Sequence, residues 1–243
     1  MRIPTKFETT MKVQAPTREI EFTLMKSERK SICVQVLRDK SVVVKTPMET
    51  SEKEIEELVI RKSRWIAKKR RQMQEKMDAE KKYVNGEYFP YLGEEYPLRV
   101  IYNENNKQLK VGILNKRLTV LMKRENKELL KKAIKEWYII QAKTKYFQSV
   151  MHYQNIVRRP YKRIWVKEHE ACWGSCTSYG SLNFNWKVVM APEEVLDYVV
   201  VHEMCHLKYM HHGPEFWSEV EKIMPDYRTW KRWLKDNGHK LTL

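Results

Sequence analysis

The stretch Val199-Val200-Val201-His202-Glu203-Met204-Cys205-His206-Leu207 contains the pattern His-Glu-x-x-His, and it decides how the C-terminal part of the chain folds. A proline and two glutamates at 192–194 suit a first helical turn, where the missing N–H costs nothing and acidic groups favour the positive end of the helix dipole. We therefore expect a helix over residues 192–209. It would present both imidazoles on one face, because residues four apart lie one above the other.

Two imidazoles and an adjacent carboxylate are typical of a hydrolytic zinc site. Neutral imidazoles bind Zn²⁺ at about 2.0–2.1 Å, and two from one helical turn leave room for a third ligand and water. Glu203 follows the first imidazole and can take a proton from that water as general base. A structural zinc site has no need of such a base, so the pattern favours an enzyme.

A third ligand is expected from the segment Tyr209-Met210-His211-His212-Gly213-Pro214. A continuous helix would carry neither His211 nor His212 onto the ligand face, so the helix must break near residue 209. A new helix should then begin at the Gly-Pro pair. The spacing from His206 to His212 equals that of H-E-x-x-H-x-x-G-x-x-H metallopeptidases, but Tyr209 stands where these have glycine. The pattern alone leaves both histidines open as the third ligand.

Upstream of this region, alternating apolar residues predict a β-rich N-terminal part. The expected strands and turns cover 19–24, 32–46, 86–122, 162–167 and 182–190. One basic helix is expected over about 51–77, begun by a capping box at Ser51 and Glu54. A second is expected over 126–151. Its predicted buried stripe is Leu130, Ala133, Ile134, Trp137, Ile140 and Phe147. We divide the chain into residues 1–125 and 126–243, with a single compact unit as the alternative.

The charge of the chain points to an anionic partner. Net charge is +16, from 47 basic and 31 acidic residues. Residues 61–82 and 116–145 each hold ten Lys/Arg against three Asp/Glu. Such a field attracts nucleic acid or a nucleotide phosphate, and the alternative is a solvated helix face. The seven glycines fit neither common glycine-rich nucleotide-binding pattern.

The remaining composition favours a reduced, cytoplasmic protein. Mean hydropathy is −0.69, no apolar stretch reaches the length of a bilayer span, and the first residues contain no apolar signal region. Four cysteines in a chain of this length do not form a disulfide framework. We expect no membrane association.

Four further segments resemble one family. They are Cys172-Trp173-Gly174-Ser175-Cys176, Leu182-Asn183-Phe184-Asn185-Trp186, the stretch 191–203 and His212-Gly213-Pro214-Glu215-Phe216-Trp217. Over roughly residues 20–237 the chain resembles the YgjP-like metal-dependent hydrolases, which are similar to the SprT and WLM zincin-type metallopeptidases. One departure is Cys172, which stands where the family usually has arginine before Trp-Gly-Ser.

The resemblance implies a zinc-dependent hydrolase with ligands His202, His206 and His212 and the base Glu203. It selects His212 over His211. The implied fold is α+β, with a zincin-like C-terminal part and a β-rich N-terminal part. A metallopeptidase acting on peptides or proteins is the first interpretation. A UTP pyrophosphatase is the alternative, because some family members are described as such, and a non-enzymatic nucleic-acid-binding module with a structural zinc is the third.

Residues near these motifs are weaker candidates for substrate contact. They are Trp173, Ser175, Asn183, Asn185 and Tyr227. Strand 182–186 would hold an extended peptide by backbone pairing if it lay at a sheet edge beside the metal. Tyr227 or Tyr209 would donate to an oxyanion. Ordinary core packing is the alternative for each of them.

Overall fold

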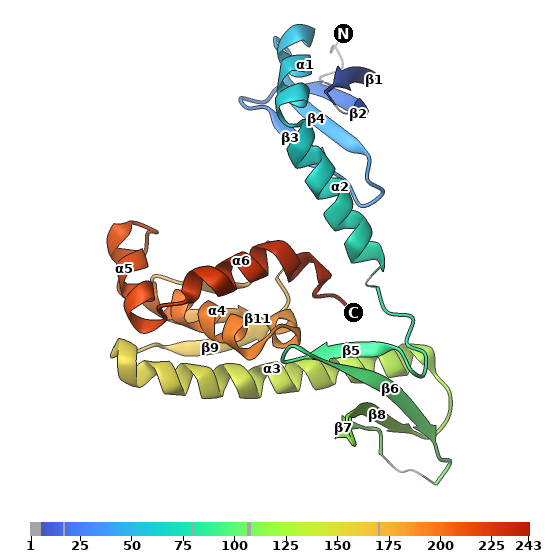
Figure 1. The fold of residues 1–243 in the computed structure, drawn as a ribbon, viewed down its shortest axis with the longest axis vertical. Coiled ribbons are helices and arrows are strands. Elements are labelled where there is room, and N and C mark those ends of the chain that lie inside the picture. The colour runs from blue at the N-terminus through green and yellow to red at the C-terminus, as the bar shows by residue number, and fades with distance from the viewer. Residues whose placement is uncertain (1–5, 17, 79, 106–107, 170) are drawn as a thin grey trace, which may run out of the picture. The chain divides into compact units, whose positions relative to one another are not determined.

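The computed structural model describes residues 6–16, 18–78, 80–105, 108–169 and 171–243, and it contains helices and sheets of the expected α+β class (Figure 1). The chain divides into two compact units, Met1–Asp78 and Ala79–Leu243, whereas the sequence analysis placed the boundary at residue 125. The difference arises because the strands of 88–122 share a core with the second unit. Phe89, Leu98 and Val120 belong to the same buried cluster as Ile134 and Leu182.

The first unit is a four-stranded sheet covered by two helices. Its strands are β1 (Lys6–Ala15), β2 (Arg18–Ser27), β3 (Cys33–Val36) and β4 (Val42–Pro47), in the order β1-β2-β4-β3. The central pair, β2 and β4, is parallel and the outer pairs are antiparallel. Apolar residues of the sheet pack on Ile55, Val59 and Ile66 of the helices and form a core of their own. The sequence analysis did not expect β1.

The single basic helix expected over 51–77 is two helices, α1 (Glu52–Arg61) and α2 (Ser63–Asp78). The break is at Lys62, the C-cap of α1, with φ −89° and ψ 2°. The buried residues of both helices keep one helical spacing across the break, so hydrophobic periodicity does not reveal it. The capping box is confirmed: Ser51 N–H donates to Glu54 Oε2 at 2.9 Å, and Glu54 N–H donates to Ser51 Oγ at 3.3 Å.

The second unit contains two small sheets and a stack of helices. One sheet has the order β5-β6-β8-β7, and its strands are β5 (Tyr88–Tyr91), β6 (Glu94–Tyr102), β7 (Lys110–Leu114) and β8 (Arg117–Met122). The other has the order β10-β11-β9, and its strands are β9 (Arg163–Lys167), β10 (Gly174–Cys176) and β11 (Ser181–Asn185). The remaining elements are α3 (Lys127–Val157), η1 (Trp186–Met190), α4 (Glu193–Cys205), α5 (Pro214–Ile223), α6 (Tyr227–Asn237) and η2 (Gly238–Lys240).

The long helix α3 supports the rest of this unit (Figure 1). It packs against α4, η1, β7 and β9, and α4 packs in turn against α5, α6 and both β10 and β11. The layer that carries the His-Glu-x-x-His motif is therefore enclosed on several sides. No helix in the described ranges is both long and apolar enough to cross a bilayer.

The buried face of α3 differs from the expected stripe in its C-terminal half. The first four expected residues are buried, but Ile140 and Phe147 are 58% and 56% exposed. Two tyrosines take their place on the core side: Tyr138 donates its hydroxyl to the carbonyl of Pro90 at 2.7 Å, and Tyr146 to that of Asn185 at 2.9 Å. A buried tyrosine with a satisfied hydroxyl is as good a core residue as an aliphatic one, and apolarity alone misses it.

Candidate metal centre

Helix α4 supplies the first two imidazoles. It begins after Pro192, with Glu193 and Glu194 in its first turn, and it ends at Cys205 rather than at residue 209 as expected. His206 is its C-cap and keeps helical angles, φ −66° and ψ −17°. The chain then turns, and Tyr209 N–H donates to the carbonyl of Cys205 at 2.9 Å. The four-residue spacing therefore still places His202 and His206 on one face, although the second histidine lies at the helix end.

The third imidazole comes from the segment just before α5. Gly213 is the N-cap of α5 and Pro214 its first residue, as the Gly-Pro pair predicts. His212 Nε2 lies 3.0 Å from His202 Nε2 and 3.1 Å from His206 Nε2. His211 is exposed and is not part of this group. The structure thus brings together His202, His206 and His212, with all three nitrogens within 4.8 Å of one another.

The geometry of this group fits one divalent cation. Three nitrogens at about 2.0–2.1 Å from a tetrahedral ion are separated by about 3.3 Å. The two distances from His212 Nε2, 3.0 and 3.1 Å, are close to this value, and the third pair lies within 4.8 Å. His206 Nδ1 lies 2.9 Å from the carbonyl of Tyr209. A carbonyl only accepts, so Nδ1 carries the proton and the Nε2 lone pair faces the other histidines.

The surroundings of His202 and His212 favour the neutral imidazole, the form that binds metal. Burial lowers the pKa of His202 to about 3, with further lowering from His206, His212 and nearby Lys231. Burial also lowers the pKa of His212, again with help from His206 and Lys231. A neutral imidazole is the species that coordinates a cation, so these surroundings favour binding at neutral pH.

Aromatic rings from α5 support all three histidines. The Phe216 ring centroid lies 4.9, 4.5 and 4.8 Å from those of His202, His206 and His212, and Phe216 is fully buried. Trp217 stacks on His212 at 5.6 Å and 23°. The sequence analysis gave Phe216 no role at the metal group. Phe216 is the third residue of α5, in the helical turn that directly follows His212.

A lysine ammonium lies next to this aromatic wall. Lys231 Nζ is 3.6 Å from the centroid of Trp217, whose other ring neighbours include His212 and Tyr227. No ion pair of Lys231 is found within the described ranges. Desolvation and Lys235 lower the pKa of Lys231. The site therefore has a lysine side chain near the imidazole group.

Glu203 lies on the buried side of the same helical turn, pressed against β10. It is 5% exposed, and burial raises its pKa to about 8. The Glu203 side chain fits beside Gly174 of β10 because glycine has no side chain. A Cβ at residue 174 would lie 2.7 Å from both Cγ and Oε1 of Glu203. A cation bound by the imidazoles would favour the ionised carboxylate and oppose the effect of burial.

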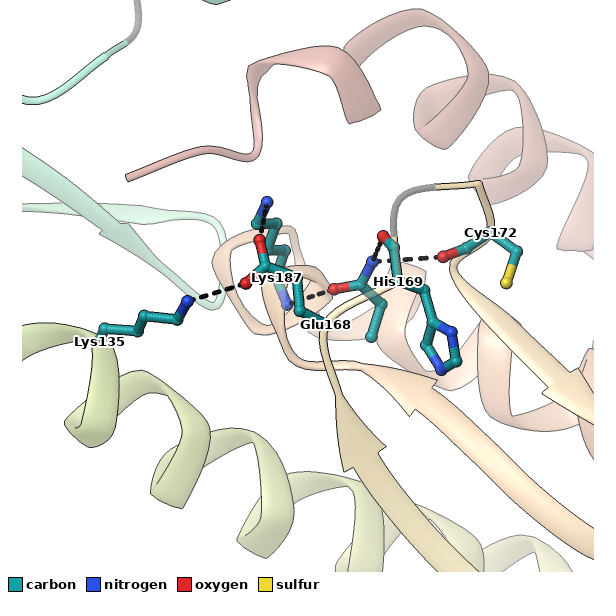
Figure 2. Close-up of polar contacts among 6 residues, drawn as sticks. Lys135, Glu168, His169, Cys172 and Lys187 are labelled. Atoms are coloured by element: carbon teal, nitrogen blue, oxygen red, sulfur yellow. Dashed lines mark hydrogen bonds and ion pairs between the residues drawn. The ribbon is translucent and has the colours of Figure 1, made fainter. Parts of the chain in front are cut away.

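The segment that leads into β10 is held by Asn185 (Figure 2). Its Nδ2 donates to the carbonyls of His169 and Cys172 at 2.8 and 3.2 Å, and its Oδ1 accepts from Lys187 N–H at 3.2 Å. Asn185 N–H also donates to the carbonyl of Trp173 at 2.8 Å. The side chain is 1% exposed, and its amide is fully engaged within the chain.

Glu168 strengthens this same segment, and the sequence analysis missed it. Its carboxylate bridges Lys135 Nζ at 2.8 Å and Lys187 Nζ at 2.7 Å (Figure 2). Hydrogen bonds from both lysines lower the pKa of Glu168 to about 2. No local pattern predicts the contact, since the partners come from α3, the end of β9 and η1.

The other predicted substrate-contacting residues differ in exposure. Asn183 is 9% exposed and donates to the carbonyl and hydroxyl oxygens of Ser175, both at 3.3 Å. Tyr227 is buried and stacks on Trp217 at 5.5 Å and 16°. Ser175 and Trp173 are half-buried. The Trp173 ring packs closely against Gly238: a Cβ on that glycine would lie 2.6 Å from Cζ2 of the ring.

Strand 182–186 does not lie at a sheet edge, the condition for holding a peptide by backbone pairing, so its alternative, ordinary core packing, agrees with the structure. Strand β11 pairs antiparallel with β10 on one side and parallel with β9 on the other, so its backbone groups are used on both sides. Its near-continuous burial reflects this central position, which alternation alone does not distinguish from an edge. The short strand β10, beside Glu203, is the edge nearest the metal group.

Comparison with known proteins identifies this region. The family model "YgjP-like, metallopeptidase domain" matches residues 30–237. Among solved structures, the crystal structure of the metallopeptidase zymogen of Pyrococcus abyssi abylysin is similar at 23% identity and a TM-score of 0.34, covering 37% of this chain and 92% of that chain. No curated protein matches the chain.

Proposed function

Because the chain belongs to the YgjP-like family and carries its metallopeptidase domain, we propose that it is a zincin-type peptidase whose zinc ligands are His202, His206 and His212. The family makes it a metal-dependent peptidase in general terms. The observation that carries the finer proposal is the convergence of three imidazole nitrogens, with Nε2–Nε2 distances of 3.0 and 3.1 Å from His212 to the other two. Three imidazoles with an open position are typical of catalytic zinc.

Zinc, when bound, supplies Lewis acidity to the reacting carbonyl and water. Glu203 acts as the general base: its carboxylate accepts a proton from the attacking water and returns it to the leaving amine. Gly174 positions this carboxylate, because only a residue without a side chain lets β10 approach Glu203 so closely. The Phe216 and Trp217 rings cover part of the imidazole group, and His212 stays exposed to solvent.

We assign the peptide to the free edge of β10. The strand pairs only with β11 among the described strands, so its other edge can accept an extended peptide by backbone hydrogen bonds. Trp173 and Ser175 would then contact the substrate. Asn183 and Asn185 are buried and hold β10 and the segment before it by hydrogen bonds, whereas Tyr227 is buried against Trp217 of α5.

A nucleoside triphosphate pyrophosphatase is the second candidate, and Lys231 favours it. An ammonium near the imidazoles suits a phosphate as well as a peptide carboxylate. The three-histidine group offers no carboxylates of the kind that Mg²⁺ prefers, which weighs against this reading. A non-enzymatic module with structural zinc is the third candidate, and the buried Glu203 beside the ligands weighs against it.

The deciding experiment compares the wild type with Glu203→Gln after loading with zinc. We expect one zinc per chain in both proteins and a loss of about 10²–10⁴-fold in turnover for the variant, the usual contribution of a general base. Metal content is measured by mass spectrometry, and turnover on a peptide library and on UTP in parallel. Cleavage of peptides alone supports the peptidase, release of pyrophosphate alone supports the alternative, and full activity of the variant would refute the role of Glu203.

A further inference from the structure

The first unit contains a groove between its sheet and α2 whose charged lining residues are all cationic. The groove has a volume of about 670 Å³. Its charged lining residues are Arg18, Lys40, Arg64, Lys68, Arg70 and Arg71. Serine, alanine and glutamine complete the lining, and no carboxylate takes part. A concave surface lined by one sign of charge focuses the field and concentrates counter-ions of the opposite sign.

The groove is built by specific contacts rather than by loose side chains. Arg70 Nε donates to the carbonyl of Lys40 at 2.9 Å, and Lys40 Nζ donates to Gln74 Oε1 at 2.7 Å. Lys40 itself has φ 68°, the left-handed conformation of the tight turn between β3 and β4. These bonds fix the turn against α2, so the two walls are held together in the absence of a ligand.

The exposed cations follow one line along the groove. Arg64, Lys68 and Arg71 lie at i, i+4 and i+7 on α2, so they share one helix face and span about 10 Å. Arg18, the first residue of β2, also lines the groove. Arginine is the cation best suited to phosphate, because its planar fork donates two parallel hydrogen bonds.

The second basic region, 116–145, differs in the partners of its lysines. Lys131, Lys132, Lys135 and Lys145 pair with Glu128, Glu136, Glu168 and Glu193 at 3.1, 3.9, 2.8 and 2.8 Å. Carboxylates of the chain therefore compensate much of this charge. The two regions have equal net charge in sequence. In the groove, Arg71 Nε pairs with Glu75 Oε1 at 3.6 Å, but Glu75 is not part of the lining, which contains no carboxylate.

We propose that this groove binds the phosphate backbone of a nucleic acid strand. A phosphodiester backbone carries its charges densely enough to meet several of these cations at once. A flat membrane surface would not enter the groove, and the lining offers no large apolar side chain to insert into lipid. The contacts reach phosphates rather than base edges, so binding is independent of nucleotide sequence.

The test is binding of labelled single-stranded RNA and duplex DNA of about 20 nucleotides to the full-length protein, measured by fluorescence anisotropy at several salt concentrations. We expect the logarithm of the affinity to fall linearly with the logarithm of salt, by about 0.7–0.9 per phosphate contact. Arg18→Gln with Arg64→Gln should lower the affinity at least about tenfold and reduce the slope by about 1.4–1.8. Chelation of metal should change nothing.

The matched control is Lys131→Gln with Lys132→Gln, which removes the same charge from the second basic region. It should retain affinity within about twofold, and thermal unfolding should show both double variants folded. Equal losses in the two double variants would overturn the proposal, because binding would then reflect net charge alone. Absence of binding at low salt, dependence on bound metal, equal competition by polyglutamate, or tighter binding to phosphatidylserine vesicles would each overturn it too.

Discussion

The imidazoles and the carboxylate of the site are held by different kinds of contact. His202, His206 and His212 come from one short stretch of chain and are supported by aromatic rings of the next helix. Glu203 instead depends on β10 and on the segment before it, which Asn185 and Glu168 tie down through hydrogen bonds and ion pairs (Figure 2). Metal binding and proton transfer should therefore be separable by mutation.

Loss of a ligand tests the imidazole side most severely. His212→Ala removes one of three converging nitrogens and should weaken zinc affinity by more than about 100-fold, beyond the effect of changing a supporting residue. Competition with a chromogenic chelator measures the affinity. His211→Ala is the matched control, since its side chain lies outside the group. Loss of zinc in the control instead would assign the third ligand to His211.

The position of the Glu203 carboxylate is tested by adding one methyl group at residue 174. Gly174→Ala places a Cβ within 2.7 Å of Glu203, so the carboxylate must move, and a displacement of about 1 Å costs about 100-fold in turnover. Zinc content should stay at the wild-type level. Gly112→Ala is the control: this glycine also lies in a strand, and a Cβ there meets nothing within 4 Å. Parallel losses of zinc and of turnover in the first variant would show that the two sides of the site are coupled.

Phe216 tests how far zinc affinity depends on the packing around the histidines when all three of them are kept. Phe216→Leu removes the ring that contacts all three histidines and should weaken zinc affinity about tenfold, the lower range for a residue that orients ligands. Turnover of the fully loaded enzyme should remain. Val220→Ala, also buried on α5, should lower thermal stability without changing zinc affinity. If Val220→Ala weakened zinc affinity more than Phe216→Leu did, Phe216 would not have the supporting role proposed for it.

The smallest effect is expected at Glu168. Its folded pKa is lowered to about 2, so its contribution to stability is present above its ordinary value near 4.5 and is lost as pH falls toward 2. The carboxylate is 40% exposed, and we expect Glu168→Gln to cost no more than about 1 kcal/mol at pH 7. Urea unfolding at several pH values measures the difference from wild type, which should shrink below about pH 4. A difference that stays constant with pH would contradict the assignment.

Prediction from sequence succeeded where the information is local. The His-Glu-x-x-His pattern, the capping box at Ser51 and the Gly-Pro helix start each lie within a few residues and are found in the structure. The α+β class, which the resemblance implied, agrees with the helices and sheets of the structure. The helix break at Lys62 was not predicted because the apolar spacing continues through it. Ile140 and Phe147 were wrongly predicted to be buried because tyrosines occupy the core face of α3.

Non-local features were beyond the reach of sequence patterns. The position of β11 between two partners, the contact of Gly174 with Glu203 and the bridge made by Glu168 all join residues far apart along the chain. The boundary between the units was set by which core the strands of 88–122 share, which no linker composition reveals. Sequence patterns therefore predicted the three histidines that converge better than the surroundings that position Glu203.

The two buried tyrosines of α3 have a consequence for local opening. The Tyr138 hydroxyl donates a hydrogen bond to a carbonyl of β5, and the Tyr146 hydroxyl donates one to the last carbonyl of β11. Helix α3 is therefore hydrogen-bonded to one strand from each sheet of the second unit. Neither strand can separate without breaking a bond to α3. In hydrogen–deuterium exchange, the amides of β5 and β11 should therefore lose protection together, as one cooperative opening event rather than two.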